Sequence, residues 1–151
     1  MKFENVKIGD VVAVSNYAGI NSGGLSRQVT HYRKLFFTLH TVDRVIKTQF
    51  CCGKLKFHKD RGDAVTNFGS GTAYFQGDNV NLGFGTKVKV PDECQAIELC
   101  EYKKAMRDIR EFASYNNHFN LFNCKSVSDA LKAVKLLNQV TELAPHKESN
   151  R

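Results

Sequence analysis

The chain has 151 residues, of which 42% are hydrophobic and 25% charged, so it suits one folded domain, or a small domain with an appendage, and wholesale disorder is excluded. Its net charge is +7, and residues 1–90 hold all of this excess: they carry 13 Lys and Arg against 6 Asp and Glu, whereas residues 91–151 carry 9 of each. All 11 glycines lie between Gly9 and Gly85, so the character of the chain is expected to change near Pro91.

The sequence favours a cytoplasmic protein. The N-terminal stretch MKFENVKIGD lacks the apolar core of a signal peptide, and no apolar run approaches the length of a membrane span. The 5 cysteines are an odd number without a Cys-x-x-Cys pair, which is typical of reduced intracellular thiols. We therefore expect no membrane partner.

Two strands and a long loop are predicted in the first part of the chain. Residues 7–14 (KIGDVVAV) alternate between two faces and predict a turn followed by a strand. Residues 15–28 (SNYAGINSGGLSRQ) are rich in Gly, Asn and Ser and are expected to form a loop. Residues 29–39 contain an aromatic cluster flanked by basic residues and predict a second strand.

Residues 41–62 (TVDRVIKTQFCCGKLKFHKDRG) predict a β-hairpin with two unlike faces. A two-residue turn at Cys52-Gly53, the commonest length of hairpin connection, would place Phe50 opposite Leu55. Because side chains alternate across a strand, the residues then sort by side. The apolar face holds Thr48, Phe50, Leu55 and Phe57, and the cationic face holds Lys47, Gln49, Lys54, Lys56 and His58. Any half-solvated sheet shows polar residues on one side, and the almost uniformly positive charge is what favours a binding surface.

The remainder of residues 1–90 is expected to complete a small barrel. Residues 67–85 contain five glycines and predict either one long loop or two short strands. Residues 86–90 (TKVKV) predict a closing strand with its valines inward and its lysines outward. Short strands joined by Gly-rich loops favour a closed antiparallel sheet, since closure removes exposed edges. The predicted fold class is α+β, with an SH3-like or OB-like barrel over residues 1–90.

After Pro91 the apolar period becomes helical, and residues 91–144 predict a hairpin of two antiparallel helices packed on the barrel or on each other. Asp92 can cap the first helix, which is expected to end near Tyr115, and Ser126 with Asp129 fits a capping box for the second. The apolar stripes are Ile97, Cys100, Ala105, Ile109, Phe112 and Ala113 in the first helix and Ala130, Leu131, Val134, Leu137 and Val140 in the second. Residues 145–151 are expected to be a flexible tail.

The sequence predicts no catalytic group, metal site or cofactor. The cysteines and histidines lack zinc-ligand spacing, and no nucleophile has a partner His and an orienting acid. The adjacent Cys51 and Cys52 could be redox-active, but two small residues beside a turn are the simpler interpretation. The tripeptides Gly69-Ser70-Gly71 and Gly83-Phe84-Gly85 resemble fragments of phosphate loops, although neither has a strand-turn-helix context.

Nucleic-acid binding is the chemistry that the residues favour. Between Arg27 and Arg61 the chain has nine basic and two acidic residues, and cations on a rigid sheet can neutralise phosphates. Lysine is a point charge that suits phosphate better than base edges, which predicts backbone binding with little sequence preference. The candidate interface residues are Arg33, Lys34, Arg44, Lys47, Gln49, Lys54, Lys56, His58, Lys59 and Arg61. If the ligand were single-stranded nucleic acid, its bases could stack on Tyr17, Phe68, Tyr74 or Phe75. For the phenylalanines, burial in the protein core is the favoured alternative.

Two stretches are similar to known families. Residues 7–24 (KIGDVVAVSNYAGINSGG) resemble the start of a KOW-type SH3-like barrel, in which a Gly-Asp-x-Val-x-Val strand enters a glycine-bearing loop. Residues 42–62 resemble a hairpin of small bacteriophage β-barrel proteins, in which a Val-x-Arg-Val-x-Lys-Thr-Gln strand precedes a basic-aromatic strand. Together they look like phage early proteins of the MotB type, which modulate transcription. This resemblance implies an SH3-like barrel, double-stranded DNA as the partner and action in the host cytoplasm.

Two functions therefore stay open. The first is a non-enzymatic DNA-binding protein that contacts the phosphate backbone. The alternative is a phage-encoded inhibitor that binds a host protein, either in host takeover or against host defence, because a cationic surface can also dock an acidic protein. An enzyme acting on small molecules is the least favoured class.

Overall fold

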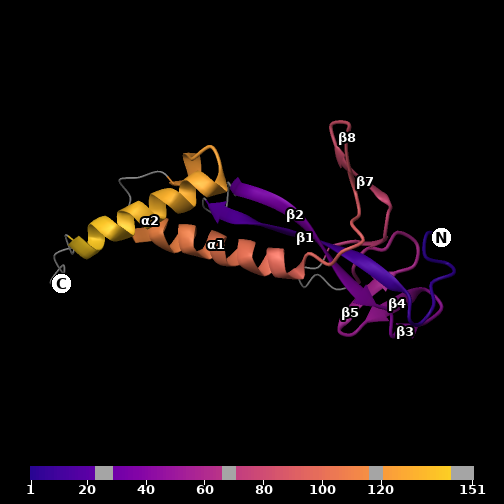
Figure 1. Ribbon diagram of the computed structural model, residues 1–151. Helices are drawn as coiled ribbons and strands as arrows, with labels where there is room; N and C mark the ends of the chain where they lie inside the picture. Colours follow the sequence, from indigo (N-terminus) through magenta and orange to yellow (C-terminus); the bar gives the residue numbers. More distant parts are fainter. Residues whose placement is uncertain (23–28, 66–70, 116–120, 144–151) are drawn as a thin grey trace. The chain divides into compact units, whose positions relative to one another are not determined.

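The computed structural model describes residues 1–22, 29–65, 71–115 and 121–143 (Figure 1). The predicted α+β class is confirmed, because small sheets and two α-helices make up the described chain. The strands are β1 (Val11–Ser22), β2 (Val29–Thr41), β3 (Arg44–Val45), β4 (Gln49–Cys52), β5 (Leu55–His58), β6 (Ala73–Phe75), β7 (Asn79–Gly83) and β8 (Thr86–Lys89). The helices are α1 (Ala96–Tyr115), the 3-10 turn η1 (Leu121–Asn123) and α2 (Val127–Leu143). Neither α-helix combines the length and the hydropathy that crossing a bilayer requires.

Contacts between residues divide the chain into two compact units. Unit 1 consists of Met1–Tyr17 and Lys34–Cys100, and unit 2 consists of Ala18–Arg33 and Glu101–Arg151. This division differs from the predicted boundary at residue 90. The long strands β1 and β2 each contribute to both units, so unit 2 contains strand residues as well as helices.

The prediction of a loop over residues 15–28 is wrong for residues 15–22, because β1 continues as a strand to Ser22. In the sheet, β1 lies between β2 and β6. Gly19 explains why a residue typical of loops stands within this strand: a Cβ added there would lie 2.9 Å from the carbonyl oxygen of His31. A glycine in a strand often marks such a close approach of a second backbone. Residues 23–28 lie outside the described residues.

The predicted hairpin exists, but its register differs by two residues. Phe50 pairs with Phe57 rather than with Leu55, which moves the turn to Gly53-Lys54. Gly53 has a positive φ of 62°, and its N–H donates a hydrogen bond to Oδ2 of Asp43 at 2.6 Å. This contact favours the observed turn. A shift of two residues keeps every side chain on its own face, so the predicted sorting of β4 and β5 is retained.

The apolar face of the β3-β4-β5 sheet packs on the N-terminal segment. Phe3, Phe50 and Phe57 are fully buried, and the Phe50 ring lies 5.0 Å from that of Phe3 and 5.4 Å from that of Phe57. Val12 and Val14 of β1 belong to the same cluster. A second cluster contains Ala13, Phe37, Val80 and Val90. Because Ala13 and its two valine neighbours enter different clusters, this part of β1 is buried on both faces.

The described residues form no closed barrel. Their strands belong to three sheets, with the orders β2-β1-β6, β3-β4-β5 and β7-β8. The predicted strand at residues 86–90 is present with Val90 buried and both lysines exposed, but it pairs with β7 alone. Closing the short β7–β8 loop costs less chain entropy than closing a barrel with a distant strand. The described part of residues 67–85 contains β6 and β7, as the two-strand interpretation expected.

The first helix begins later than predicted. Asp92 does not cap it, because α1 starts at Ala96. The preceding Gln95 is held against β2 by two hydrogen bonds: its backbone N–H donates to the carbonyl oxygen of Phe37 at 3.0 Å, and its Oε1 accepts from the Phe37 N–H at 2.9 Å. A contact distant in sequence, and not a local cap, therefore sets this helix start.

The buried face of α1 also differs from the predicted stripe. Ile97 is 74% exposed and Cys100 is exposed, whereas Leu99, Met106 and Ile109 are buried. These three buried residues share one face at helical spacing, whereas Ile97 and Cys100 point to the other side of the helix.

The start of α2 is as predicted. Oγ of Ser126 accepts a hydrogen bond from the backbone N–H of Asp129 at 3.1 Å, and Ala130 and Val134 of the predicted stripe are buried. This agreement follows from the local nature of a helix cap and of an i, i+4 stripe, which need no distant partner to be recognised.

The prediction of an antiparallel helix pair is wrong. Figure 1 shows α1 and α2 running in the same general direction. Antiparallel neighbours need a loop of only about two to five residues, whereas the segment between the two helices is longer and contains η1. Residues 116–120 of this segment, and the predicted tail at 145–151, lie outside the described residues.

Tyr32 holds the strands and helices of unit 2 together. Its hydroxyl donates to the backbone carbonyls of Leu121 and Cys124, and its own carbonyl accepts a hydrogen bond from the Tyr102 hydroxyl at 2.6 Å. The backbone of Tyr32 has a φ of +56°, which is rare for a bulky residue. Ile20 of β1 is buried in the same core as residues of both helices.

Candidate nucleic-acid interface

The outer face of the β3-β4-β5 sheet carries positive charge. Arg44, Cys51 and Lys56 pair across the three strands, and on the same face Gln49 pairs with His58. Directly paired residues in an antiparallel sheet have their Cβ atoms about 4.5–5.5 Å apart, so Arg44 and Lys56 lie on either side of Cys51, two strands from each other. Arg44, Lys56 and His58 are exposed, whereas Cys51 between them is buried. Arg44, Gln49, Lys56 and His58 are called the basic face below.

Two more lysines lie at the turns of this sheet. Lys54 follows Gly53 in the β4–β5 turn, and Lys47 lies in the β3–β4 turn, which is closed by a hydrogen bond from the Ile46 N–H to the Gln49 carbonyl at 2.9 Å. Both lysines are exposed. The sequence placed Lys47 on the cationic face of the hairpin strands, but the strand starts only at Gln49, which takes the position opposite His58. Lys47 and Lys54 add positive charge at the turns of the same small sheet.

The sheet that carries these charges is held firmly from behind. Phe50 and Phe57 project from its opposite face into the core. The N-terminal segment also closes over the turn that follows β5, because the N–H of Phe3 donates to the Lys59 carbonyl at 2.9 Å. A rigid support reduces the entropy that exposed cations lose when they bind a ligand.

The cations of this sheet are available for an outside partner. Within the described part of the chain, Arg44, Lys47, Lys54 and Lys56 make no ion pair and no side-chain hydrogen bond. The carboxylate of the neighbouring Asp43 accepts the Gly53 N–H instead. Exposed lysines and arginines in this state can exchange counterions for phosphates without first breaking a protein contact.

The remaining predicted residues are placed differently. Lys59 and Arg61 lie in the turn after β5, where Lys59 is only 9% exposed and Arg61 is exposed. Lys34 lies on β2, outside this sheet, with its Nζ 5.2 Å from the centre of the Phe36 ring. Arg33 belongs to unit 2. The structure therefore brings the basic face and its two turn lysines together, and it does not bring Lys34 to that sheet.

The aromatic residues proposed for base stacking are largely structural. The ring of Phe75 lies 4.5 Å from that of Phe3 and packs against the core. Tyr74 is partly buried, and this burial raises the pKa of its hydroxyl. Tyr17 is 48% exposed, and Phe68 lies outside the described residues.

The two adjacent cysteines are not reactive groups of this surface. Cys51 and Cys52 are each 6% exposed. Burial, with smaller effects of Asp43 and Cys51, raises the pKa of the Cys52 thiol to about 11, so this thiol stays protonated at neutral pH. Among the residues that the structure describes, no three His, Cys, Asp or Glu side chains gather in a group that could hold a metal ion.

A second cationic element of unit 1 was not among the predicted site residues. In the β7–β8 hairpin Lys87 pairs with Asn81 and Lys89 pairs with Asn79, and all four residues are exposed. The sequence alone could have indicated this cationic hairpin, because residues 79–91 (NVNLGFGTKVKVP) contain two lysines and no acidic residue.

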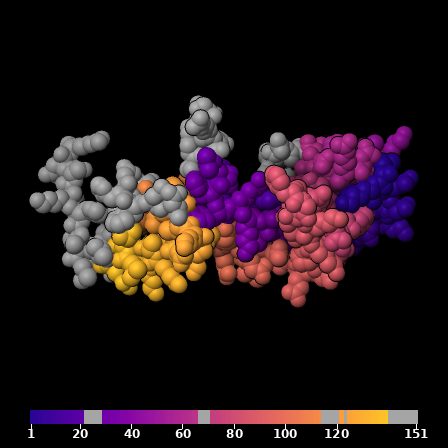
Figure 2. Space-filling view, turned by 90° about the horizontal axis from the view of Figure 1, so that it is seen from above, coloured from indigo at the N-terminus to yellow at the C-terminus, as the bar shows by residue number. Residues whose placement is uncertain are grey.

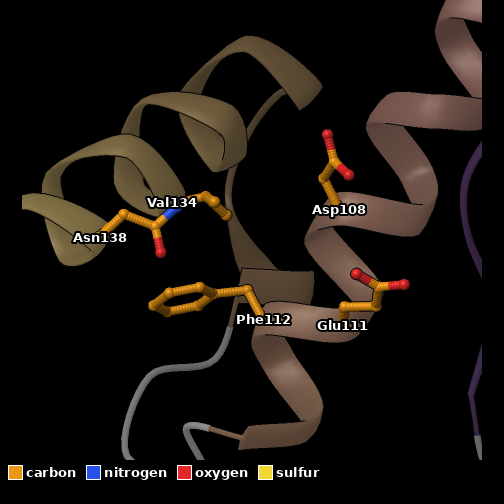
Figure 3. Close-up of a pocket in the computed structure, with 5 residues that line it drawn as sticks. All are labelled: Asp108, Glu111, Phe112, Val134 and Asn138. Carbon is orange, nitrogen blue, oxygen red and sulfur yellow. The ribbon is translucent and has the colours of Figure 1, made fainter. Parts of the chain in front are cut away.

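Unit 2 offers a hollow of different character. A groove of about 320 Å³ between α1 and α2 is lined by Asp108, Glu111, Phe112, Val134 and Asn138 (Figure 3). Two carboxylates at its edge would repel phosphate groups. The favourable electrostatics for a polyanion therefore lie in unit 1.

Comparisons of the chain with protein-family models, curated proteins and solved structures gave no match.

Proposed function

We propose that the protein binds double-stranded DNA without catalysing a reaction on it, by contacting the phosphate backbone with little sequence preference. The observation that carries this proposal is the basic face, where Arg44, Lys56 and His58 are exposed together on one supported sheet. Its permanent cations make no ion pair with another described residue. A surface of this kind supplies the sequence-independent part of DNA affinity.

The residue types favour phosphates over bases as ligands. The basic face and the two turns of its sheet carry four permanent cations, and three of them are lysines, whose ammonium groups act as point charges (Lys47, Lys54 and Lys56). Arg44 alone has the planar fork that reads guanine, and Gln49 can donate its amide N–H to a phosphate oxygen. Binding is therefore expected to depend strongly on salt and weakly on sequence.

The cellular role is a further part of this proposal. We infer a phage-encoded modulator of transcription that acts in the cytoplasm of the host, with the small sheets of unit 1 in an SH3-like arrangement. The resemblance of residues 7–24 and 42–62 to KOW-type and phage β-barrel proteins supports this role. The short antiparallel strands around the Phe3, Phe50 and Phe57 core are compatible with such a fold.

Charge reversal on the basic face tests the proposal. In a gel mobility-shift experiment at low salt, the wild-type protein should retard duplex DNA, and Arg44→Glu with Lys56→Glu should abolish the shift. The matched control is Lys132→Glu with Lys135→Glu, which reverses two exposed charges on α2 and should leave binding nearly unchanged. Circular dichroism should show that both variants are folded. A wild-type protein that fails to shift DNA at low salt would contradict the proposal.

The second candidate function is an inhibitor that binds an acidic host protein. Ile46, which is 42% exposed beside the basic face, favours this alternative because protein interfaces combine apolar and charged contacts. A pull-down from nuclease-treated host lysate separates the two functions. A stoichiometric partner that is retained by the wild-type protein and lost by Arg44→Glu with Lys56→Glu, together with no affinity for DNA, would establish the inhibitor.

A further inference from the structure

The β7–β8 hairpin ends in a fully exposed aromatic side chain. Phe84 has an exposed fraction of 110%, which means that it has no more cover than in an extended peptide. It lies between Gly83 and Gly85, and a Cβ added at either glycine would meet no atom within 4 Å. In Figure 1 the hairpin stands out from the other strands of unit 1, and Figure 2 looks down on its uncovered salmon-coloured atoms.

Folding does not account for a phenylalanine at this position. Phe84 has a φ of +51°, in the left-handed region that disfavours bulky side chains, and the flanking glycines also have positive φ. Glycine or asparagine would suit this turn better. The phenylalanine bears this backbone strain and buries no surface within the described chain in return. Exposure of a single aromatic side chain is common, but its combination with backbone strain at this tip points to a partner.

The base of the hairpin is firmly anchored, so its tip is presented in a defined direction within unit 1. Val80 and Val90 are 6% and 1% exposed in a core cluster that also holds Phe37. The Val90 N–H donates to the Asp78 carbonyl at 2.8 Å, and the Gly77 N–H donates to the Val90 carbonyl at 3.2 Å. Near the tip, Oδ1 of Asn81 accepts the Gly83 N–H at 3.0 Å.

The charges of the hairpin indicate the chemistry of the partner. Lys87 and Lys89 lie on β8 behind Phe84, and residues 79–91 contain no acidic side chain. These charges fit a partner that presents anionic groups along the strands and an apolar site at the tip. Duplex DNA combines both features, because its phosphates flank base pairs that can accept an apolar side chain between them.

We propose that the β7–β8 hairpin is a second DNA-contacting element, which enters the minor groove and inserts Phe84 between two stacked base pairs. Lys87 and Lys89 would contact the phosphates at the edges of the groove. Two-stranded β-ribbons are known to dock in DNA grooves, and an inserted apolar side chain kinks the duplex by about 20–90°. The inference rests on the proposed DNA-binding function but depends on different residues and predicts a different property, which is bending.

Bending can be measured with a duplex of about 30 base pairs that carries a donor and an acceptor fluorophore at its two ends. Over this length a sharp kink is distinguished from the smooth flexibility of DNA. The wild-type protein should raise the energy-transfer efficiency as the ends approach each other. Phe84→Ala should lose this increase, whereas Phe84→Leu should retain part of it because leucine also acts as a wedge. Lys87→Gln with Lys89→Gln should reduce the slope of log affinity against log salt by about 1.8, the value for two phosphate contacts.

The outcomes separate this inference from the proposed function. If the wild-type protein binds the duplex without bending it, or if Phe84→Ala bends it equally, the wedge is overturned while backbone binding stands. If the wild-type protein does not bind DNA at all, both are overturned. A Phe84→Ala variant that keeps DNA bending but loses a host protein in a pull-down would instead make the tip a protein-docking site and overturn the inference. Because Phe84 is exposed, its variants should unfold at the wild-type temperature.

Discussion

Neutralising two cations of the basic face should reduce the salt dependence of DNA binding by an amount that the structure allows us to calculate. The basic face and its turns present four permanent cations, Arg44, Lys47, Lys54 and Lys56. If each neutralises one phosphate, log affinity should fall against log salt with a slope of about −3.6, which is roughly a 150-fold loss between about 50 and 200 mM salt. Arg44→Gln with Lys56→Gln should reduce the slope to about −1.8 and the loss to roughly 12-fold.

The difference of about 1.8 between the two slopes is the decisive quantity. Contacts made by Lys87 and Lys89 would make both slopes steeper by the same amount and leave this difference unchanged. Fluorescence anisotropy of a labelled duplex over a salt series measures the slopes directly. Both substituted side chains are exposed and make no ion pair within the described chain, so the free energy of unfolding should change by no more than about 0.5 kcal/mol.

A matched variant, Lys132→Gln with Lys135→Gln on α2, removes the same charge from unit 2 and should keep the wild-type slope. Equal slopes for the wild-type protein and for Arg44→Gln with Lys56→Gln would refute the reasoning, because the basic face would then make no phosphate contact. A reduced slope in the α2 control would show that net charge, and not the position of the charge, governs binding.

Three further predictions concern the fold. Gly19→Ala should lower the free energy of unfolding in urea by about 1–3 kcal/mol, because the added methyl group would lie 2.9 Å from the His31 carbonyl oxygen; unchanged stability would show that β2 is not so close. Tyr32→Phe should also lower the free energy of unfolding by about 1–3 kcal/mol, since it removes the donor for the carbonyl of the buried Leu121. Thermal unfolding measures this loss, and a smaller loss would show that water replaces the hydroxyl. The free energy of unfolding should fall as the pH rises from about 9 to about 11, because burial raises the pKa of Cys52 to about 11 and the unfolded chain therefore loses the thiol proton first. Cys52→Ala should remove this part of the pH dependence, and an identical profile for both proteins would rule out Cys52 as its cause.

The sequence predicted the features that depend on local pattern. The two-faced hairpin could be predicted although its register was two residues off, because the face of a side chain changes only with an odd shift. The start of α2 at Ser126 was also predictable, since a cap and an apolar stripe are properties of neighbouring residues. The location of the excess positive charge before Pro91 follows from counting alone.

Contacts between distant residues decided the rest. Asp43 holds the Gly53 N–H and so favours the observed turn, the close approach of His31 explains a strand through Gly19, and Phe37 sets the start of α1 through Gln95. The exposure of Phe84 is of the same kind, because the sequence pattern of a phenylalanine between two glycines is compatible with a buried or an exposed side chain. By itself the sequence therefore determined which residues share a face and where the charge lies. The tertiary structure decided where strands and helices begin and end and which aromatic side chain is left exposed, since these depend on partners that lie far away along the chain.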